Sequence, residues 1–434
     1  MPKSQQFSVS PIEMVHHRLP LQIGIFLVLT GLLGLSACAP DEAPSRADGV
    51  AELQLEPVDV PAVGSSGEPY LSLAGDKVLF SWLDSEGSQT RLQVAEVTSS
   101  GIVGVTSAGG GDDLFVNWAD VPATVQTGSG YRLAHLLRRG GRGTYDYAIE
   151  LMGSADGGES WQPLDVVHDD ATPTEHGFVS ITADDRDGAA VLWLDGRRHV
   201  DGPEGPATGE MTLRWRPFAP ESGLGETQIV DERVCDCCQT GMVRTTDAWV
   251  AVYRDRSPDE VRDIHWARRA DRDGQWQLQG AVAEDGWVIA GCPVNGPALA
   301  ARGDTVAVAW FSAPNDEPRV RFALSVDGAQ SFESATRLDA GDPIGRVDLT
   351  FDDQGAVHAL WIEQLDDAAA LVLRSFRGDA WSPAQRLVDI DGGRASGFPR
   401  IAQAPWGELL VAWTETHSDG STQVRLARLV EGTS

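Results

Sequence analysis

The sequence predicts an all-β fold built from one module that is repeated seven times, and three observations support this prediction. Short hydrophobic strands ending in an aromatic residue recur along the chain, with a histidine in that place once, and their spacings are 53, 58, 60, 57, 51 and 52 residues. Each copy contains four runs rich in β-branched or aromatic residues, and Gly, Asp, Asn or Pro separate the runs. Such a repeat is typical of a radial β-propeller, whose blades cannot bury their faces alone.

The residues that mark the seven copies lie near the end of the second run of each. They are Trp82, His135, Trp193, Tyr253, Trp310, Trp361 and Trp413. The four runs are clearest in the fifth and sixth copies. They cover 294–301, 305–310, 319–324 and 335–338 in the fifth copy, and 345–349, 356–361, 370–374 and 385–388 in the sixth. We therefore expect one four-stranded blade per copy.

The two ends of the chain complement each other. The seventh copy stops at 427–430, one strand short of a blade, while segment 51–60 precedes the first copy without a partner of its own. That segment resembles the last strands of other copies, such as 384–390. We expect it to complete the final blade, so that the ring has no open edge at which other chains could pair.

Two turn motifs lie between the third and fourth strands of their copies, three periods apart. They read SADGGESW and SVDGAQSF, and both resemble the Asp box, S-x-D-x-G-x-[ST]-[WF], the BNR repeat motif of sialidases and related propellers. We interpret the motif as a structural turn, because Asp and Ser oxygens bond to nearby backbone groups and the aromatic ring fills the gap between sheets. The matching residues are Ser154, Asp156, Gly158, Trp161, Ser325, Asp327 and Phe332.

The resemblance implies a sialidase-like propeller, which we place at residues 51–434. Sialidases hold the sugar carboxylate with three arginines, use a tyrosine activated by a glutamate as nucleophile, and use an aspartate as acid and base. This chain has no tyrosine after Tyr253 and no counterpart of the family's early Arg-Ile-Pro motif. True sialidases have six blades, so six is the alternative to the seven that the repeats indicate. We expect no release of sialic acid. If the protein is an enzyme, the resemblance implies a glycoside hydrolase of sialidase-like type.

Chemically unusual residues gather on loops that we expect at one rim. The Asp-box turns occupy the other rim, because they connect third and fourth strands, whereas these loops connect blades or connect second and third strands. Propellers bind ligands where loops of several blades converge. We therefore expect an anionic ligand, such as a carbohydrate. The candidate ligand-binding residues are His176, Arg197, Arg254, Arg256, Asn295, Arg346 and Arg400.

Four carboxylates on the same rim are candidates for catalysis. Glycoside hydrolysis needs one protonated and one ionised carboxyl group at a common point. The candidates are Glu175, Asp195, Asp255 and Glu260. The alternative interpretation of the arginines and acids together is structural: they form ion pairs that hold neighbouring loops in place.

Four cysteines fall on two successive loops between blades. They are Cys235, Cys237, Cys238 and Cys292. Outside the cytoplasm such a set favours disulfides, and we expect a bond from Cys292 to one of the other three. Adjacent cysteines do not both reach distant partners easily, so a Cu or Zn site is the alternative, with His168 and His176 nearby. The second functional hypothesis is therefore a metal-binding or envelope-assembly scaffold without glycosidase activity.

The N-terminal residues 1–37 resemble a bacterial lipoprotein signal peptide. Arg18 precedes an apolar stretch, 19–35, that ends in the sequence LSAC at Cys38. We expect cleavage before Cys38, lipidation of that residue, and a flexible tether within residues 38–50. The alternatives are an ordinary cleaved signal and an uncleaved anchor. Ala39 after the cysteine favours the outer membrane of the cell envelope.

The net charge of −30 is informative about partners. A chain this acidic is a poor partner for nucleic acid or for anionic surfaces. In such a chain, a local cluster of arginines is an informative exception. The 434 residues include 47 Gly and 14 Trp, and no composition shift or long linker divides the chain after the leader. We therefore expect one large β domain.

Overall fold

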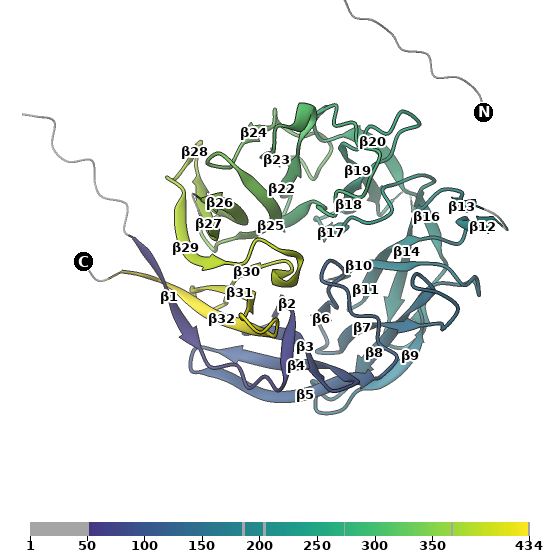
Figure 1. The fold of residues 1–434 in the computed structure, drawn as a ribbon, viewed down its shortest axis with the longest axis horizontal. Helices are drawn as coiled ribbons and strands as arrows, with labels where there is room; N and C mark the ends of the chain where they lie inside the picture. The colour runs from purple at the N-terminus through teal and green to yellow at the C-terminus, as the bar shows by residue number, and fades with distance from the viewer. Residues whose placement is uncertain (1–51, 185–186, 203–204, 273, 366–367, 433–434) are drawn as a thin grey trace, which may run out of the picture. The chain divides into compact units, whose positions relative to one another are not determined.

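The structure is a computed structural model that describes residues 52–184, 187–202, 205–272, 274–365 and 368–432. Seven antiparallel sheets stand in a ring around a central axis (Figure 1), and each has four main strands. In the described part of the chain, helical structure is limited to the 3-10 turns η1 (Pro314–Asp316) and η2 (Arg394–Ser396). The protein is thus an all-β, seven-bladed propeller, as the repeats predicted, and the six-bladed alternative is wrong.

The strands follow one another from the axis outward in each blade. The first blade contains β2 (Ser65–Ala74), β3 (Lys77–Glu86), β4 (Gln89–Thr98) and β5 (Gly101–Gly111), and the second contains β6 (Thr124–Gln126), β7 (Arg132–Arg139), β8 (Tyr147–Ser154) and β9 (Gln162–Val166). The third contains β10 (His176–Ala183), β11 (Ala189–Asp195), β14 (Thr212–Ala219), β15 (Gly223–Leu224) and β16 (Gln228–Asp231), with a hairpin of β12 (Val200–Gly202) and β13 (Gly205–Thr208) inserted.

The remaining four blades repeat this order. The fourth contains β17 (Gly241–Arg244), β18 (Ala248–Arg254), β19 (Ile264–Ala270) and β20 (Gln277–Ala281), and the fifth contains β21 (Ala298–Arg302), β22 (Thr305–Ser312), β23 (Arg319–Ser325) and β24 (Thr336–Arg337). The sixth contains β25 (Pro343–Phe351), β26 (Val357–Leu365), β27 (Ala368–Arg377), β28 (Ala380–Trp381) and β29 (Gln385–Ile390), and the seventh contains β30 (Arg400–Gln403), β31 (Leu409–Thr416), β32 (Thr422–Glu431) and β1 (Leu53–Val58).

The core is divided among the seven interfaces between adjacent blades. One cluster of buried side chains occupies each interface. The marker residues of the second strands lie in or beside these clusters, and Trp82, Trp193, Trp310 and Trp361 are fully buried. Burying a large apolar side chain contributes roughly 1.5–3 kcal/mol. Blade stacking therefore stabilises the ring, and this explains the period of the aromatic markers.

His135 takes the place of the marker aromatic residue in the second blade. Its side chain is fully buried, and its Nδ1 accepts a hydrogen bond of 3.2 Å from the backbone N–H of Ala123. Burial lowers the pKa of this imidazole to about 3, so it is neutral at ordinary pH. The histidine is thus a core residue that fills the gap in the aromatic series.

The N-terminal strand closes the ring, as the sequence predicted. Strand β1 pairs antiparallel with β32 from Leu53 opposite Glu431 to Val58 opposite Leu426. Figure 1 shows this pair as the purple first strand beside the yellow last strand. Because the two ends of the chain share one blade, unfolding of either end removes a strand from the same sheet.

The two turns that match the Asp-box pattern have the same hydrogen bonds. In the second blade, Ser154 Oγ donates to Asp156 Oδ1 over 2.8 Å, and the N–H of Gly158 donates to Ser154 Oγ over 2.8 Å. In the fifth blade, Ser325 Oγ donates to Asp327 Oδ1 over 2.8 Å, and the N–H of Ala329 donates to Ser325 Oγ over 3.0 Å. The Ser and Asp of each segment therefore hold a local turn.

The aromatic residue that ends each of these segments reaches the preceding blade. Trp161 Nε1 donates to Thr106 Oγ1 over 3.3 Å, and Phe332 packs edge-to-face on Trp266 with ring centroids 5.2 Å apart. These contacts tie outer strands of neighbouring blades together. The segments thus have structural roles, on the rim formed by the hairpins between first and second strands and by the turns between third and fourth.

The innermost strands of three blades carry a bulge at the same place. Glu68, Phe178 and Arg346 have φ values of 51°, 51° and 55°, and the strand register shifts beside each. A glycine precedes each bulge residue; a Cβ on Gly177 would lie 2.3 Å from Asp120 Oδ2. That same oxygen accepts the N–H of Phe178 over 2.6 Å, so the glycine allows the carboxylate to approach the bulge.

The predicted signal peptide, the lipidation site at Cys38 and the tether lie outside the described residues. In the segments that the structure covers, no helix is both long enough and apolar enough to span a membrane.

Candidate functional site: a rim cavity and a cysteine cluster

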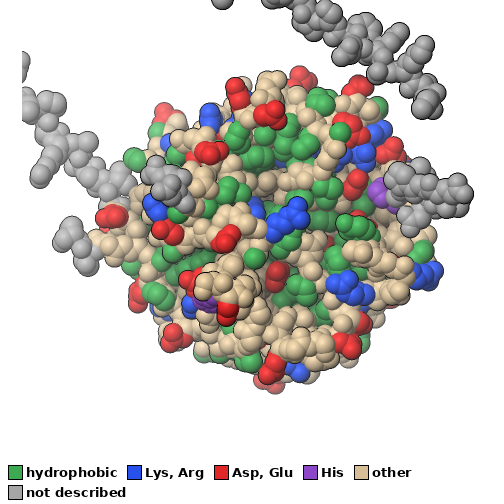
Figure 2. Space-filling view, viewed as in Figure 1, with side chains coloured by type: hydrophobic (Ala, Val, Ile, Leu, Met, Phe, Trp, Pro, Cys, Tyr) green, Lys and Arg blue, Asp and Glu red, His purple; other side chains and the backbone are tan. Residues whose placement is uncertain are grey.

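A cavity of about 610 Å³ lies on the rim opposite the Asp-box turns. Its walls come from loops between blades, at 112–123, 167–175, 232–240, 282–297 and 391–399, and from two loops within blades, at 140–146 between β7 and β8 and at 196–199 between β11 and β12. Acidic and basic side chains are interspersed on the face seen in Figure 2 and form no single patch of one sign. This face therefore presents no broad electrostatic field of one sign.

Glu175 stands at the wall of this cavity, immediately before β10. The hydroxyl of Tyr147 donates a hydrogen bond of 2.5 Å to Glu175 Oε1. Burial raises the pKa of Glu175 to about 8, and the negative charges of Asp120 and Asp236 add to this effect, whereas the bond from Tyr147 opposes it. At neutral pH Glu175 is therefore a protonated acid that faces the cavity.

Asp195, the second acidic candidate, is fully buried away from the cavity. It accepts hydrogen bonds of 2.9 Å from Trp193 Nε1 and 2.7 Å from Arg197 Nε. The same arrangement recurs in the first blade, where Trp82 Nε1 donates to Asp84 over 2.8 Å. A carboxylate two residues after a marker tryptophan thus satisfies the indole N–H, and Asp195 has this role.

The other two acidic candidates also lie off the cavity wall. Arg256 and Arg262 donate to Glu260 over 2.9 Å and 2.8 Å, and these bonds lower its pKa to about 2. Asp255 is half-buried with His265 Nε2 3.8 Å away, and burial raises its pKa. Of the four carboxylates chosen from the sequence, Glu175 alone lines the cavity.

Two of the arginine candidates are buried and donate to backbone carbonyl groups. Arg254 donates to the carbonyls of Arg262, Asn295 and Phe311 over 2.5–2.7 Å. Arg346 donates to Gly393 O over 2.8 Å and to Gly397 O over 3.2 Å, and burial lowers its pKa to about 10. Arg254 therefore connects the fourth and fifth blades, and Arg346 connects the sixth blade to the loop before the seventh.

Asn295 has a matching structural role. Its Oδ1 accepts the N–H of Arg346 over 2.8 Å, as Asp120 accepts the N–H of Phe178. A Cβ on Gly345 would lie 2.5 Å from this oxygen, so the bulge in β25 also depends on glycine. Asn295, on the loop before the fifth blade, thus supports the inner strand of the sixth blade.

The remaining arginine candidates are paired with carboxylates. Arg197 binds Asp169 over 2.6 Å, and Arg256 binds Asp236 over 3.1 Å. Arg400 lines a separate cavity of about 190 Å³ between the innermost strands, where Asp348 lies 3.8 Å away. The structure therefore pairs each of these arginines with an acid, which is the structural alternative raised from the sequence.

His176 and His168 form a group of their own with Asp170. The imidazole rings are stacked with centroids 3.7 Å apart, and His176 Nε2 and His168 Nδ1 each lie 3.1 Å from Asp170 Oδ1. Arg197 Nη2 lies 3.1 Å from the same oxygen. The positive guanidinium already neutralises this carboxylate, and the two histidines belong to a group distinct from the cysteines.

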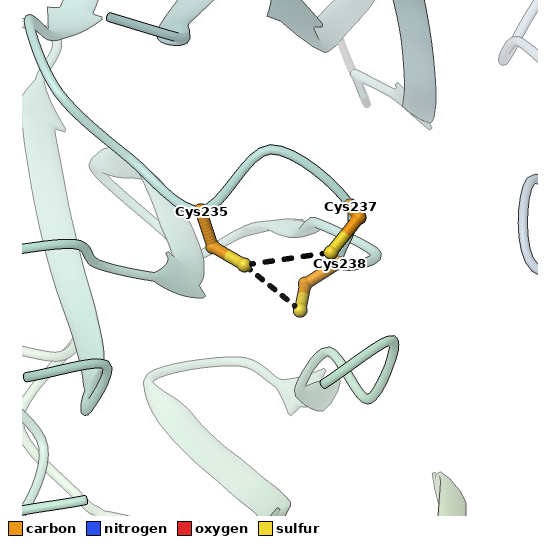
Figure 3. A group of neighbouring side chains, drawn as sticks. All are labelled: Cys235, Cys237 and Cys238. Atoms are coloured by element: carbon orange, nitrogen blue, oxygen red, sulfur yellow. Dashed lines mark hydrogen bonds between the residues drawn. The ribbon is translucent and has the colours of Figure 1, made fainter. Parts of the chain in front are cut away.

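Cys237 and Cys292 line the rim cavity, Cys235 and Cys238 are buried, and all four are free thiols. Figure 3 shows the sulfurs of Cys235, Cys237 and Cys238 pointing toward one another. Cys235 Sγ lies 3.9 Å from Cys237 Sγ and 3.2 Å from Cys238 Sγ, well beyond the roughly 2.05 Å of a disulfide. The disulfides expected from the sequence are therefore not present, because three sulfurs converge on one point rather than forming pairs.

Several cavity residues were not among the sequence candidates. Trp118 lies under the guanidinium groups of Arg346 and Arg394, at 4.8 Å and 6.0 Å from its ring centroid. Tyr145, Arg142 and Arg394 are exposed residues of the cavity wall. Trp118 and Tyr145 are aromatic residues on loops, outside the repeating strand markers, and that departure from the repeat is the signal that identifies them.

Comparison with known proteins supports the fold and no more. No family model matches the sequence, and no curated protein is similar to it. Among solved structures, the polysaccharide lyase Uly1 is 10% identical over 92% of this chain and 94% of its own, with a TM-score of 0.53. A protein of unknown function from Dyadobacter fermentans is 13% identical over 74% of this chain and 97% of its own, with a TM-score of 0.51.

A third similar structure is a variant of the NanB sialidase from Streptococcus pneumoniae. It is 10% identical over 87% of this chain and 94% of its own, with a TM-score of 0.46. The two structures with TM-scores of 0.51 and 0.53 show a shared fold alone, and function has to be argued from the site itself.

Proposed function

We propose that the protein binds an acidic carbohydrate in the rim cavity and that Glu175 serves as the acid of this site. The observation that carries the proposal is the position of Glu175, a carboxyl group with a pKa of about 8 at the wall of a 610 Å³ cavity. A strongly perturbed acid in a cleft is characteristic of functional sites. The hydrogen bond from Tyr147 fixes its orientation.

The other cavity residues suit an acidic sugar. Tyr145 is exposed at the cavity and offers an aromatic face against which a sugar ring can pack. Arg142 and Arg394 lie at the same cavity on separate loops and are exposed to solvent. Guanidinium groups form paired hydrogen bonds with carboxylates, so these two arginines, rather than those chosen from the sequence, are our candidates for the ligand's charge.

The acid also permits a chemical step. A protonated Glu175 can give its proton to a glycosidic oxygen while the bond from that oxygen to the anomeric carbon breaks. Water then supplies the hydroxyl group to the sugar, and a carboxylate accepts the proton that the water loses. Asp236 lines the same cavity and is our candidate for that second group.

A glycan array that contains sialylated, uronate-containing and neutral glycans tests this proposal. We expect binding of acidic glycans near pH 6, weaker binding above pH 8 where Glu175 ionises, and at least tenfold weaker binding by Arg394→Gln. Arg302→Gln, an exposed change away from the cavity, serves as the control and should bind as the unaltered protein does. Absence of acidic-glycan binding, or equal binding by Arg394→Gln, would overturn the proposal.

An assay with a fluorogenic sialoside tests whether the protein releases sialic acid. We expect no release of sialic acid, because the late tyrosine of sialidases is missing from this chain. Sialic acid release that disappears in Arg254→Lys would contradict this expectation and would restore the arginine clamp as the binding site.

We also propose that the protein works in the bacterial cell envelope, attached through a lipid on Cys38 and facing the periplasm or the cell surface. The lipobox-like sequence before Cys38 supports this location. In a bacterial host, the full chain should incorporate labelled palmitate and fractionate with outer membranes. The Cys38→Ser chain should do neither, and equal labelling of both chains would defeat the proposal.

A further inference from the structure

We propose that Cys235, Cys237 and Cys238, with Cys292 beside them, bind one thiophilic metal ion, Cu(I) or Zn(II), at the edge of the rim cavity. This site borders the same cavity as Glu175 and shares the loop of Asp236, but the proposal does not depend on carbohydrate binding. It rests on the convergence of the sulfurs, on the anchoring of their loop and on the charge beside them.

The sulfur positions suit a single metal ion. The Sγ atoms of Cys235, Cys237 and Cys238 all lie within 4.8 Å of one another. Bonds of about 2.3 Å to a tetrahedral zinc ion place sulfur ligands about 3.8 Å apart, close to the 3.9 Å between Cys235 and Cys237. The 3.2 Å between Cys235 and Cys238 would have to open by about 0.6 Å to reach the same separation.

Cys292 supplies a fourth sulfur from the next loop. Cys292 and Cys237 both line the cavity, so the thiol of Cys292 lies at the same edge of the rim as the three converging sulfurs. Four thiolates complete a structural zinc site, and three with an open position suit a thiophilic ion that remains accessible. The exposed position of Cys292 gives an incoming ion a path to the buried sulfurs.

The loop that carries three of the ligands is fixed at its start. The N–H of Cys235 donates to Arg254 O over 3.0 Å, and the N–H of Val234 donates to Met211 O over 2.9 Å. Cys235 and Cys238 are buried. The sulfurs are thus held in place by the blades before any ion binds, which lowers the cost of ordering the ligands.

A positive charge lies beside the sulfurs. Arg262 Nη1 lies 3.2 Å from Cys235 Sγ, and the side chain of Arg262 is only 4% exposed. A Zn(II) ion with four thiolates, or a Cu(I) ion with three, carries a net charge of −2. Arg262 offsets part of this charge in a region from which water is largely excluded.

A buried imidazole nitrogen without a hydrogen-bond partner in the described part of the chain belongs to a residue that lines the same cavity. His199 lines the cavity with Cys237 and Cys292, and its Nε2 is buried with no hydrogen-bond partner among the described residues. Buried polar atoms without partners are uncommon in folded proteins, and a ligand is one explanation for them. His199 is therefore the residue we expect to respond when an ion enters the site.

Metal analysis of the full-length protein tests the inference. After loading with Zn(II) or with Cu(I) under reducing conditions and desalting, we expect about one ion per chain. Competition with bicinchoninate for Cu(I), and with a chromophoric chelator for Zn(II), distinguishes the two ions. Substitution by Co(II) should give the thiolate-to-cobalt charge-transfer bands of a sulfur-rich site. A strong chelator should lower the melting temperature, because an ion bound only by the folded state stabilises it.

Two cysteine variants and one control variant test whether these thiols bind the ion. Cys292→Ser changes an exposed residue, so it should fold normally and bind either ion at least tenfold more weakly. Cys238→Ser should lose the ion. Arg302→Gln should bind it as the unaltered chain does. Folded protein that binds neither ion, binding that both cysteine variants retain, or two disulfides found by mass spectrometry in the protein isolated without reductant would each overturn the proposal.

Discussion

The hydroxyl of Tyr147 donates a 2.5 Å hydrogen bond to Glu175 Oε1 from the protein interior. Tyr147 is buried, and its ring stacks on Phe115 with centroids 4.1 Å apart, so the donor has little freedom. One carboxyl oxygen of Glu175 is thereby used as an acceptor. In the protonated acid, the other oxygen carries the hydrogen, which Glu175 can present to a ligand in the cavity.

Replacing Tyr147 by phenylalanine should raise the pKa of Glu175 further. The bond from the tyrosine favours the ionised carboxylate, so its loss leaves burial and the neighbouring acids unopposed. We expect the alkaline limit of ligand binding to move upward by roughly half a unit or more, with a loss of about 1 kcal/mol in the free energy of unfolding. Titrations of binding and of urea unfolding measure the two effects. An alkaline limit that moves downward would contradict the assignment of Glu175 as the titrating acid.

Stability should fall as the pH rises from about 5 to 8. Burial raises the pKa values of Glu68 and Asp120 to about 7 and that of Glu175 to about 8. The folded chain therefore holds three protons that the unfolded chain releases above pH 4.5. Each group lowers the unfolding free energy by at most about 1.4 kcal/mol per pH unit between its two pKa values.

Below about pH 5, other carboxylates make the stability of the fold fall as the pH decreases. The pKa values of Glu260 and Asp327 are held at about 2, so their stabilising contribution is present at neutral pH and is lost as the pH falls toward 2. We expect the highest melting temperature near pH 5 to 6. The Glu175→Gln chain should show a shallower decline toward pH 8 than the unaltered chain, and parallel declines would show that Glu175 is not buried as described.

Removing the first strand should open the ring. Deletion of 51–60 exposes the edge of β32, which pairs with β1 over six residue pairs, and an unpaired edge strand promotes aggregation. We expect loss of soluble, cooperatively folding protein. Deletion of 39–49 is the matched control and should change only membrane attachment. Equal melting temperatures for the two truncations would refute ring closure by β1.

The architecture could be predicted from the sequence because every blade needs a large buried residue at the same position, and this need produces the repeat. Each blade needs a large residue in its second strand to fill the space against a neighbour, so Trp82 and Trp361 mark their copies, and even the histidine of the second blade, His135, is buried there. Closure was predictable for the same reason: a blade with three strands leaves an edge, and segment 51–60 had no other partner.

The site was predicted less well, because spacing along the chain does not show where a side chain is used. Of the acidic candidates, Glu175 lines the cavity, whereas Asp195 and the arginines were chosen for their charge on the expected rim. The repeat itself distinguishes Asp195, since a carboxylate also stands two residues after the marker tryptophan at Asp84 and Glu363. Trp118 was missed because a single aromatic residue on a loop belongs to no repeat.

The last prediction separates the structural and ligand-binding interpretations of Arg254. Its guanidinium group donates to three backbone carbonyls and lies 4.9 Å from the ring centroid of Trp287. Arg254→Met fills a similar volume but leaves the carbonyls of Arg262, Asn295 and Phe311 without these donors. An unsatisfied buried polar group costs about 1–3 kcal/mol, so we expect a loss on the order of 3 kcal/mol or more in the free energy of unfolding.

Arg254→Lys should recover little of this loss, because one ammonium group cannot take the planar arrangement that the three carbonyls require. Arg394→Gln is the matched control: it changes an exposed arginine of the cavity, should alter stability by less than about 0.5 kcal/mol, and should weaken binding of the acidic glycan. Urea unfolding and glycan binding, measured on the same three variants, give opposite patterns for the two arginines. If Arg254→Met unfolds like the unaltered chain and loses ligand binding, then Arg254 contacts the ligand, and its hydrogen bonds to the carbonyls do not hold the blades together.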